Sequence, residues 1–361
     1  MTLIPHRTVA SQVAMLLRAE IAKGTWRGWL PGERTLCETV QASRNTLRAA
    51  LVQLRAEGVV EPLVGLGTRV ISAAPRIGKA GDTKTVGVLI PEPIGSLRPL
   101  IALWIDELKD LLLAEGCRLR VHEGKQYYQS NPSRALERLV GQHTHDAWVL
   151  TLSSEVMQRW FARRKLPCLV AGSTYADVAL PHYDLDYRAI CRHAAGVLLG
   201  LGHRRIALLN RESRRAGDVD SEAGFLEGVR TSSVTDAVAD VAYHRDDVDS
   251  VGQALTRLLG RKNPPTALVV SNSYAYLATT SLLAQRGLRI PQDISLISRD
   301  DDPFLGSLAP APARYIVSPH AFAKKMIGPL LQLVAREPVV RTRGALQPKF
   351  MAGGSMAWVG S

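Results

Sequence analysis

The chain has 361 residues, of which 46% are hydrophobic and 22% are charged, and this globular composition excludes a largely disordered, collagen-like or low-complexity protein. No apolar run approaches the roughly 20 residues of a membrane helix, and no signal peptide is evident, so we expect a cytoplasmic protein without a membrane partner. The net charge is +12, and residues 1–84 carry half of that excess in under a quarter of the chain. A compact basic segment indicates a polyanionic partner, either nucleic acid or an anionic membrane.

The first 72 residues are predicted to hold three helices and a small hairpin. Ser43 is a suitable N-cap for the third helix, because its hydroxyl can accept a hydrogen bond from a free N–H group of the first turn. Three helices and a hairpin in this length form a winged helix-turn-helix, and residues 73–84, which lack an apolar period, are expected to be a linker. The expected helices are 7–23, 33–40 and 43–56, and the expected strands are 59–62 and 68–72.

The third helix has two chemically distinct faces. Four apolar residues recur at i, i+3, i+4 and i+7, which predicts one stripe that faces a core. The opposite face carries three arginines and an asparagine, which can pair with guanine, adenine and phosphate in a major groove. An ordinary solvated helix face has the same composition. The apolar residues are Leu47, Ala50, Leu51 and Leu54, and the polar residues are Arg44, Asn45, Arg48 and Arg55.

The stretch LPGERTLCETVQASRNTLRAALVQLRAEGVVEPLVGLGTRV (30–70) resembles the winged helix-turn-helix of the gluconate-repressor (GntR) family of bacterial transcription regulators. One departure is Gly32, which stands where the family commonly has serine and weakens one helix cap. The matching motifs, in order, are Leu30-Pro31 with Glu33-Arg34, then Ser43-Arg44, Leu54 with Glu57-Gly58, and Gly65-Leu66-Gly67-Thr68.

This resemblance implies a set of DNA contacts. Arg34 and Ser43 would meet phosphates, while Arg44, Asn45 and Arg48 would read base edges. The glycines of the wing would allow close approach of the backbone to the minor groove. The residues implied as DNA contacts are Arg34, Ser43, Arg44, Asn45, Thr46, Arg48, Gly65 and Gly67.

From Thr85 onward, short apolar strands alternate with amphipathic helices, which predicts parallel sheets with crossover helices. The strands are too many for one ordinary sheet, so we expect an α/β domain of two lobes over residues 85–361. The expected strands are 86–90, 118–122, 147–151, 167–172, 205–209, 240–244, 267–271 and 294–298, and the expected helices are 98–115, 132–141, 154–164, 188–201, 221–231, 249–260 and 274–286.

The segment LGHRRIALL (201–209) resembles a signature of lactose-repressor-family regulators, which carry a periplasmic-binding-protein-like sensor. Gly224-Phe225 and GLRIPQDISLISRDDDP (287–303) follow in the family's order, and the resemblance spans 85–356. It implies two α/β lobes, joined by three crossovers, that close on a small molecule at the carboxyl ends of the strands. The positions implied as ligand contacts are Ile94, Leu97, Asp186, Asn272 and Asp300.

Four residues depart from the family's ligand-site pattern. Ser221 stands where arginine is common, Tyr187 where asparagine is common, Ser273 where aspartate is common, and Arg299 where an aromatic residue is common. Carboxylate and amide groups suit hydroxyl-rich ligands such as sugars. The departures leave the identity of the ligand open.

These features predict a transcription regulator, by default a repressor, that binds a near-palindromic operator as a homodimer and a small-molecule effector, such as a sugar-like molecule, between the sensor lobes. The alternative is an α/β enzyme or small-molecule-binding protein with an accessory basic module. The sequence contains no GxSxG elbow, Walker A loop, HExxH motif or GxGxxG after a strand, so we predict neither catalytic residues nor a cofactor. His143-Thr144-His145-Asp146 is expected to be a surface turn rather than a metal site. The four cysteines have no CxxC spacing, which fits a reducing cytoplasm.

Overall fold

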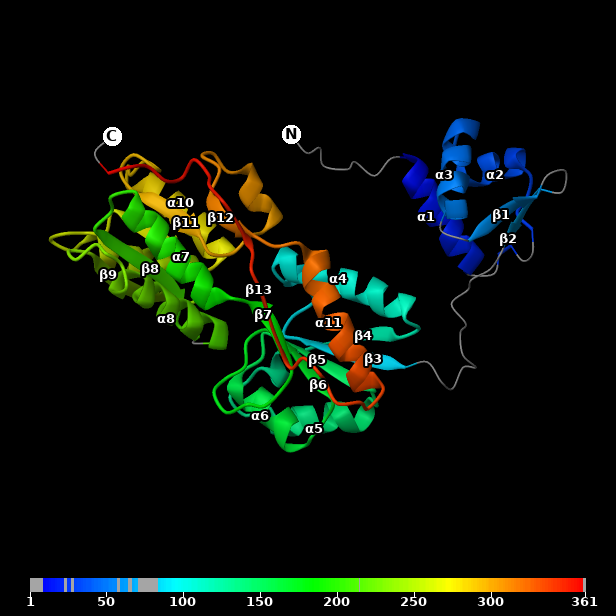
Figure 1. Cartoon of the computed structure of the whole chain (residues 1–361), viewed down its shortest axis with the longest axis horizontal. Helices are drawn as coiled ribbons and strands as arrows, with labels where there is room; N and C mark the ends of the chain where they lie inside the picture. Colours follow the sequence, from blue (N-terminus) through cyan, green and yellow to red (C-terminus); the bar gives the residue numbers. More distant parts are fainter. Residues whose placement is uncertain are drawn as a thin grey trace. The chain divides into compact units, whose positions relative to one another are not determined.

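The computed structural model describes residues 9–22, 25–26, 29–56, 59–63, 67–70, 84–213 and 215–359. The chain divides into two compact units, Met1–Thr83 and Lys84–Ser361 (Figure 1). Of the predicted linker 73–84, only Lys84 lies among the described residues. In that described part of the chain, no helix is both long and apolar enough to cross a bilayer.

The first unit packs three helices and a two-stranded sheet around one small core. Leu17, Leu36, Leu47 and Leu54 are almost completely buried there. Because these leucines come from all three helices, burial of apolar area ties the helices to one another. The elements are α1 (Val9–Ala22), α2 (Glu33–Val40), α3 (Arg44–Ala56), β1 (Val60–Leu63) and β2 (Gly67–Val70).

The hairpin of the first unit is antiparallel, with Val60 opposite Val70 and Leu63 opposite Gly67. Trp29 adds an isolated bridge to Arg69, so the segment before α2 is also tied to this sheet. Three helices followed by this hairpin confirm the predicted winged helix-turn-helix, and each described helix lies within two residues of its expected ends.

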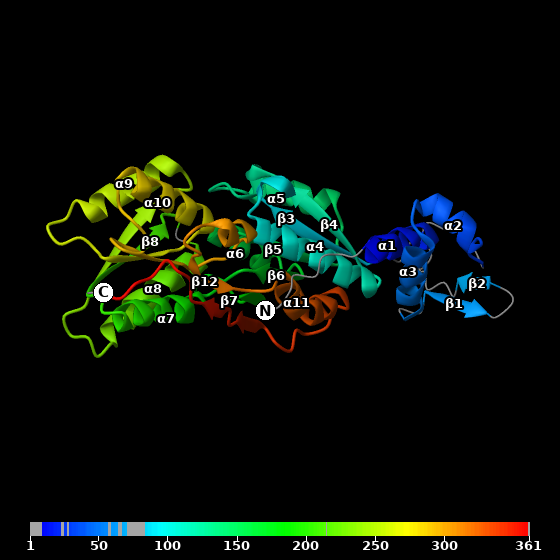
Figure 2. The same ribbon diagram turned by 90° about the horizontal axis from the view of Figure 1, so that it is seen from above.

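The second unit consists of two lobes, each built on a six-stranded sheet (Figures 1 and 2). In the first lobe the strand order is β13-β7-β6-β5-β3-β4, and every pair is parallel. The first lobe contains β3 (Thr85–Ile90), η1 (Ile94–Ser96), α4 (Pro99–Ala114), β4 (Arg118–Glu123), η2 (Lys125–Tyr127), α5 (Ser133–Gln142), β5 (Ala147–Thr151), α6 (Glu155–Arg163), β6 (Cys168–Ala171), β7 (His182–Leu185), α11 (Pro319–Val334) and β13 (Arg343–Leu346).

The second lobe repeats this plan with the strand order β14-β12-β11-β10-β8-β9, in which only β14 is antiparallel to its neighbour. It contains α7 (Tyr187–Gly200), β8 (Arg205–Arg211), α8 (Ala216–Arg230), β9 (Val238–His244), α9 (Val248–Leu259), β10 (Ala267–Val270), α10 (Ser273–Gln285), β11 (Ser295–Ser298), η3 (Pro303–Ser307), β12 (Ala313–Ile316) and β14 (Lys349–Met351).

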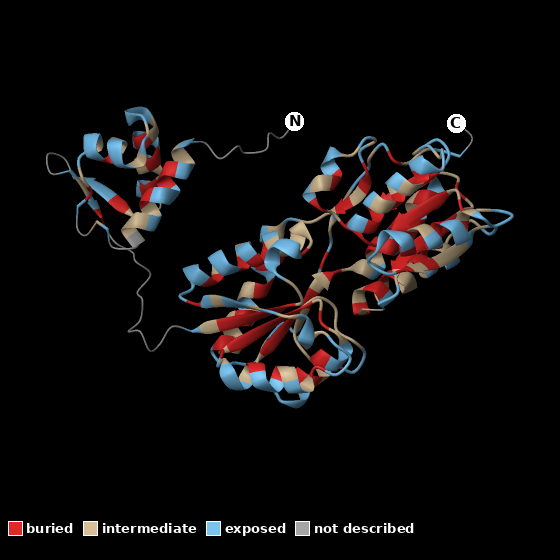
Figure 3. Cartoon of the chain, turned by 180° about the vertical axis from the view of Figure 1, so that it is seen from behind, coloured by how far each residue is buried: buried red, intermediate tan, exposed pale blue. Residues whose placement is uncertain are grey.

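Helices cover both faces of each sheet. In the first lobe α4 and α11 pack on one face and α5 and α6 on the other; in the second lobe α7 and α8 lie opposite α9 and α10. The central strands are therefore buried on both sides, which is why β5 reads as the continuous apolar run AWVLT. Figure 3 shows the buried strands between helices, and each helix buries only the side that faces the sheet.

The chain passes between the lobes three times, as predicted. It crosses from β7 to α7, from β12 to α11, and from β13 to β14. The carboxyl ends of the parallel strands of both lobes border the cavity described below, because the residues that follow β5, β6, β8 and β11 line it.

Several elements of the second unit were not predicted. The expected elements ended at residue 298, whereas the chain continues through β12, α11, β13 and β14. These three strands have only three or four residues, and α11 contains Pro329, which ordinarily argues against a helix. The expected helix 221–231 also begins earlier, at Ala216. Its first turn buries Asp218, and a hydrophobic pattern does not reveal a buried carboxylate, so this start was not predicted.

Candidate functional site

The two predicted faces of α3 exist. Leu47, Ala50 and Leu54 are completely buried, whereas Arg44 and Arg48 are exposed on the other side of the helix. The polar face is therefore available for a ligand, and its arginines lie on a regular helix.

Ser43 caps this helix, as predicted. Its Oγ accepts a hydrogen bond of 3.2 Å from the Thr46 N–H and lies 2.8 Å from Thr46 Oγ1. The cap stabilises the first turn of α3, which carries Arg44 and Asn45, so it holds both side chains in place.

Arg48 is tied to α2 by an ion pair that the sequence did not suggest. Its Nε lies 3.1 Å from each carboxylate oxygen of Glu33, and its Nη2 lies 3.0 Å from Oε2. The hydrogen bonds from Arg48 lower the pKa of Glu33 below its ordinary value. Arg48 Nη1 makes no hydrogen bond to Glu33, and the Arg34 side chain is 85% exposed.

Of the two wing glycines predicted to contact DNA, one lies among the described residues. Gly67 begins β2 with φ +107°, a backbone conformation that side-chain-bearing residues rarely adopt. Gly65 lies outside the described residues.

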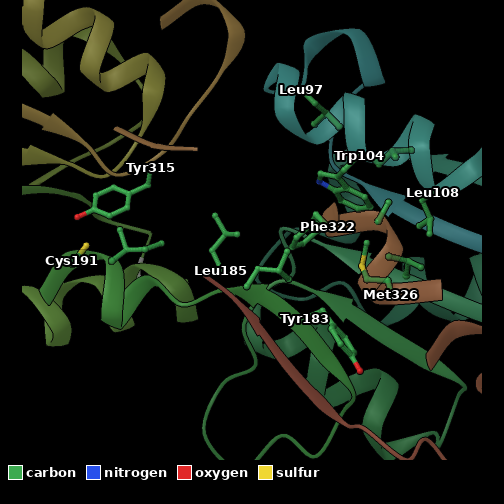
Figure 4. Packing of buried hydrophobic residues seen from close by; sticks show 14 of the residues in the cluster. Leu97, Trp104, Leu108, Tyr183, Leu185, Cys191, Tyr315, Phe322 and Met326 are labelled. Carbon is green, nitrogen blue, oxygen red and sulfur yellow. The ribbon is translucent and has the colours of Figure 1, made fainter. Parts of the chain in front are cut away.

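A cavity in the second unit is lined by residues of both lobes. Trp104 of α4 and Phe322 of α11 form an edge-to-face pair with ring centroids 5.5 Å apart, and Figure 4 shows them together in the first lobe. Tyr187, at the start of α7, contributes an aromatic ring from the second lobe. The cavity thus combines an aromatic wall with charged side chains.

A buried network of charges crosses from one lobe to the other. Asp300 accepts hydrogen bonds from Arg299 Nε (3.0 Å) and Nη2 (3.2 Å), and from Arg98 Nη1. Arg98, which precedes α4, also donates to Asp302 Oδ2 at 2.9 Å. Burial alone would raise the pKa of Asp300, but the charges of Arg299 and Arg98 outweigh it and lower the pKa to about 2.

Three of the departures from the family pattern lie in mutual contact. Arg299 Nη1 donates to Ser221 Oγ at 2.8 Å and to Asp218 Oδ1 at 3.1 Å. Its guanidinium carbon lies 4.3 Å from the centre of the Tyr187 ring. Ser221 on α8 is small, and the guanidinium that binds it comes from Arg299 at the end of β11.

Of the predicted ligand residues, the structure places Asp300 on the cavity but not the other four. Asp186 caps α7 through the Ala189 N–H and accepts a hydrogen bond from Gln347. Asn272 is buried, caps α10, and lines an adjoining cavity with Leu97. Ile94 is 40% exposed in η1, and neither cavity includes it. As ligand contacts, all five positions stay predictions.

Most of the charged residues at the cavity were not predicted from the sequence. Arg98 comes one residue after Leu97, and Arg211, Arg215 and Asp218 flank the start of α8. No local motif marks these side chains, because partners far apart in the chain determine their roles. Asp184, at the end of β7, was missed together with its strand.

The segment 143–146 is not the expected surface turn throughout. His145 is 8% exposed, and its Nε2 lies 2.7 Å from Nε2 of His122 on β4. Its Nδ1 lies 3.0 Å from Thr85 Oγ1. The sequence could not show this, since His122 comes from a different strand. Across the residues that the structure describes, no group of three histidine, cysteine or acidic side chains could hold a metal ion.

Comparisons with known proteins agree with both units. Residues 9–70 match the family model for bacterial regulatory proteins of the gntR family, and residues 195–356 match that for a periplasmic binding protein-like domain. The arabinose metabolism transcriptional repressor of Geobacillus stearothermophilus is 26% identical over 288 residues, which cover 76% of each chain.

Solved structures share the fold of the second unit. The transcription regulator CcpA of Lactococcus lactis superimposes with a TM-score of 0.68 at 18% identity, over 76% of this chain and 100% of the other. A regulatory protein of the LacI family from Chloroflexus aggregans superimposes with a TM-score of 0.64 at 21% identity, over 75% and 98%.

A DNA-binding domain and a ligand-sensing domain on one chain define a ligand-responsive transcription regulator. In this chain the DNA-binding domain matches the gntR-family model, the sensor matches the periplasmic binding protein-like model, and the fold of the sensor is shared with solved LacI-family regulators.

Proposed function

We propose that this regulator is a cytoplasmic repressor that binds a near-palindromic operator as a homodimer and responds to an effector held between its sensor lobes. The observation that carries the proposal is the exposed basic face of α3, inside a gntR-family domain, on the same chain as an interlobe cavity. The Geobacillus relative is named a transcriptional repressor, which supports repression rather than activation in this proposal.

In this proposal the DNA contacts have distinct roles. Arg44, Asn45 and Arg48 read base edges in the major groove, since guanidinium and amide groups match guanine and adenine. Arg34 and Ser43 contact phosphates, which positions the helix without reading sequence. The wing approaches the minor groove at Gly65 and Gly67, and Thr46 supports the cap.

The roles of the arginines can be separated by substitution. Arg44→Ala is expected to weaken binding to the operator by about 1–3 kcal/mol, while binding to unrelated DNA changes little. Arg34→Ala is expected to weaken binding to both DNAs and to flatten the salt dependence, because it removes a phosphate contact. The measurement is a gel shift with the DNA upstream of the protein's own gene, at several salt concentrations.

Arg18→Ala is the matched control, because Arg18 lies on α1 and outside the basic face of α3. It should bind both DNAs almost as the unsubstituted protein does. Unchanged operator affinity in both Arg44→Ala and Arg34→Ala would show that this face does not bind DNA.

The homodimer gives a second expected result. A single winged module buries little surface on DNA, and linking two modules raises their effective concentration. Sedimentation at micromolar concentration should therefore give twice the 39.3 kDa mass of one chain. A monomer that binds the operator tightly at a ratio of one to one would contradict the dimer.

The effector acts, in this proposal, by favouring one arrangement of the two sensor lobes. It can shift the population of arrangements only by its difference in affinity for them. Gel shifts with small metabolites that raise the melting temperature should show a changed operator affinity. If none of those metabolites changes operator binding, the proposed response to ligand is wrong.

A further inference from the structure

Carboxylates at the interlobe cavity already form ion pairs with arginines. Asp300 is bound by Arg299 and Arg98, and Asp218 is bound by Arg299. Asp301 pairs with Arg314 at 2.8 Å. Asp300 therefore has little capacity left to accept hydrogen bonds from ligand hydroxyls, and guanidinium groups already offset the charges of Asp218 and Asp301.

The acidic groups of the adjoining cavity are paired as well. Glu92 lies 3.2 Å from Lys125 Nζ, Asp246 lies 3.0 Å from Arg211 Nε, and Asp247 lies 3.4 Å from the guanidinium of Arg245. Arg98, Arg211 and Arg215 line both cavities, so the two spaces adjoin along this row of arginines.

Two basic groups in this row still have donors to offer. Arg215 makes no ion pair or side-chain hydrogen bond with any residue that the structure describes. Arg211 Nε is buried and lacks an aligned hydrogen bond, although Asp246 is close by. Asp246 Oδ1 lies 3.0 Å from this nitrogen and offsets the charge of Arg211, so Arg211 offers a ligand oxygen an additional donor rather than an uncompensated charge.

Among the described residues that line the interlobe cavity, Asp184 is the acid without a basic partner, and it does not balance these donors. Asp184 already accepts hydrogen bonds of 2.8 Å from Ser173 Oγ and from the Leu185 N–H. Burial raises its pKa to about 7, so a large fraction of this carboxyl is neutral near physiological pH. The cavity is therefore rich in donors and poor in free acceptors.

The start of α8 adds to this donor surplus. Ala216 and Gly217 line the cavity, and no side chain caps the helix. The Ala216 N–H already binds Tyr175 and the Asp218 N–H the Arg215 carbonyl, so the helix dipole is what this terminus adds for an anion. A Cβ on Gly217 would lie 2.8 Å from the Tyr187 ring, so glycine is required for this close packing.

We propose that the effector carries an oxyanion group, a carboxylate or a phosphate, that binds Arg215 and Arg211 beside the start of α8. This inference rests on the proposed response to an effector and specifies its chemical class. A neutral polyol would leave Arg215 without a charged acceptor, and an unpaired group in a site discriminates strongly against a ligand.

The test uses the full chain with sodium phosphate and sodium acetate as separate probes, at constant ionic strength. Melting temperature is measured against the concentration of each anion. Arg215→Gln removes the charge at the site, and Arg134→Gln is its matched control, since Arg134 lies in the first turn of α5, another helix without a side-chain cap.

We expect one anion to raise the melting temperature of the unsubstituted protein and of Arg134→Gln. Arg215→Gln should need an anion concentration at least about tenfold higher for the same shift, because a charge-assisted hydrogen bond is lost. A response to phosphate identifies a phosphate ester, and a response to acetate identifies a carboxylate. Equal responses of Arg215→Gln and the unsubstituted protein to both anions would overturn the inference.

Gel shifts with neutral sugars separate this inference from the proposed function. If a neutral sugar changes operator binding and acts equally on Arg215→Gln, the oxyanion inference is wrong and the response to an effector stands. If neither neutral nor anionic compounds change operator binding, the proposed response itself fails.

Discussion

Asp300→Ala is expected to lower the free energy of unfolding of the sensor by about 3–5 kcal/mol, because it removes the shared carboxylate from two buried ion pairs. Asp300 is 3% exposed and is bound by Arg299 and Arg98, whose side chains are 4% and 15% exposed. Removal of the carboxylate would leave Arg299 with Asp218 alone and Arg98 with Asp302 alone. Chemical denaturation followed by circular dichroism measures the change.

Asp106→Ala is the matched control for this substitution. Asp106 pairs with Lys109 on the surface of α4, so its loss is expected to leave the unfolding transition almost unchanged. If Asp300→Ala unfolds at the same denaturant concentration as the unsubstituted protein, the buried network does not hold the lobes together.

This network also bears on the prediction that the Asp300 carboxylate contacts the ligand. The resemblance to the lactose-repressor family implies that its carboxylate accepts hydrogen bonds from the ligand. In the structure both oxygens already accept hydrogen bonds from guanidinium groups. Loss of a ligand response in Asp300→Ala would therefore report on damage to the cavity, and Arg215→Gln is the sharper test of ligand contact.

Features that depend on nearby residues were predictable from the sequence. Ser43 caps α3 through Thr46, three residues away, and Leu47, Ala50 and Leu54 are buried at helical spacing. Likewise β5 is buried between two layers of helices along its whole length, as its apolar run indicates. Each of these outcomes follows from the geometry of one element.

The candidate site was less predictable, because distant side chains form it. Arg98 and Asp300 are 202 positions apart, and Arg299 contacts Ser221 from 78 positions away. In the sequence, the residues at 187, 221 and 299 were visible only as separate departures from the family's ligand-site pattern. Only the fold shows that Ser221 and Tyr187 both contact the guanidinium of Arg299.

The Gly224-Phe225 motif has a physical basis in the packing of α7 against α8. A Cβ on Gly224 would lie 2.1 Å from the carbonyl oxygen of Arg188, and one on Gly228 would lie 2.7 Å from that of Arg192. The obstructing atoms are backbone, so a side chain could be accommodated only if the helices moved apart. Phe225, which is completely buried in the core, would move with α8.

Gly224→Ala is accordingly expected to lower the free energy of unfolding of the sensor by about 3 kcal/mol, the upper part of the ordinary range for overpacking. Gly196→Ala on α7 is the control, since a Cβ there meets no atom within 4 Å. This control should raise stability by about 0.5–1 kcal/mol, because alanine favours a helix over glycine. Urea denaturation of both variants measures the difference, and equal stability of Gly224→Ala and Gly196→Ala would show that α7 and α8 separate easily. A loss confined to Gly224→Ala would show that the close contact of the two helices, rather than the helical preference of glycine, requires this residue.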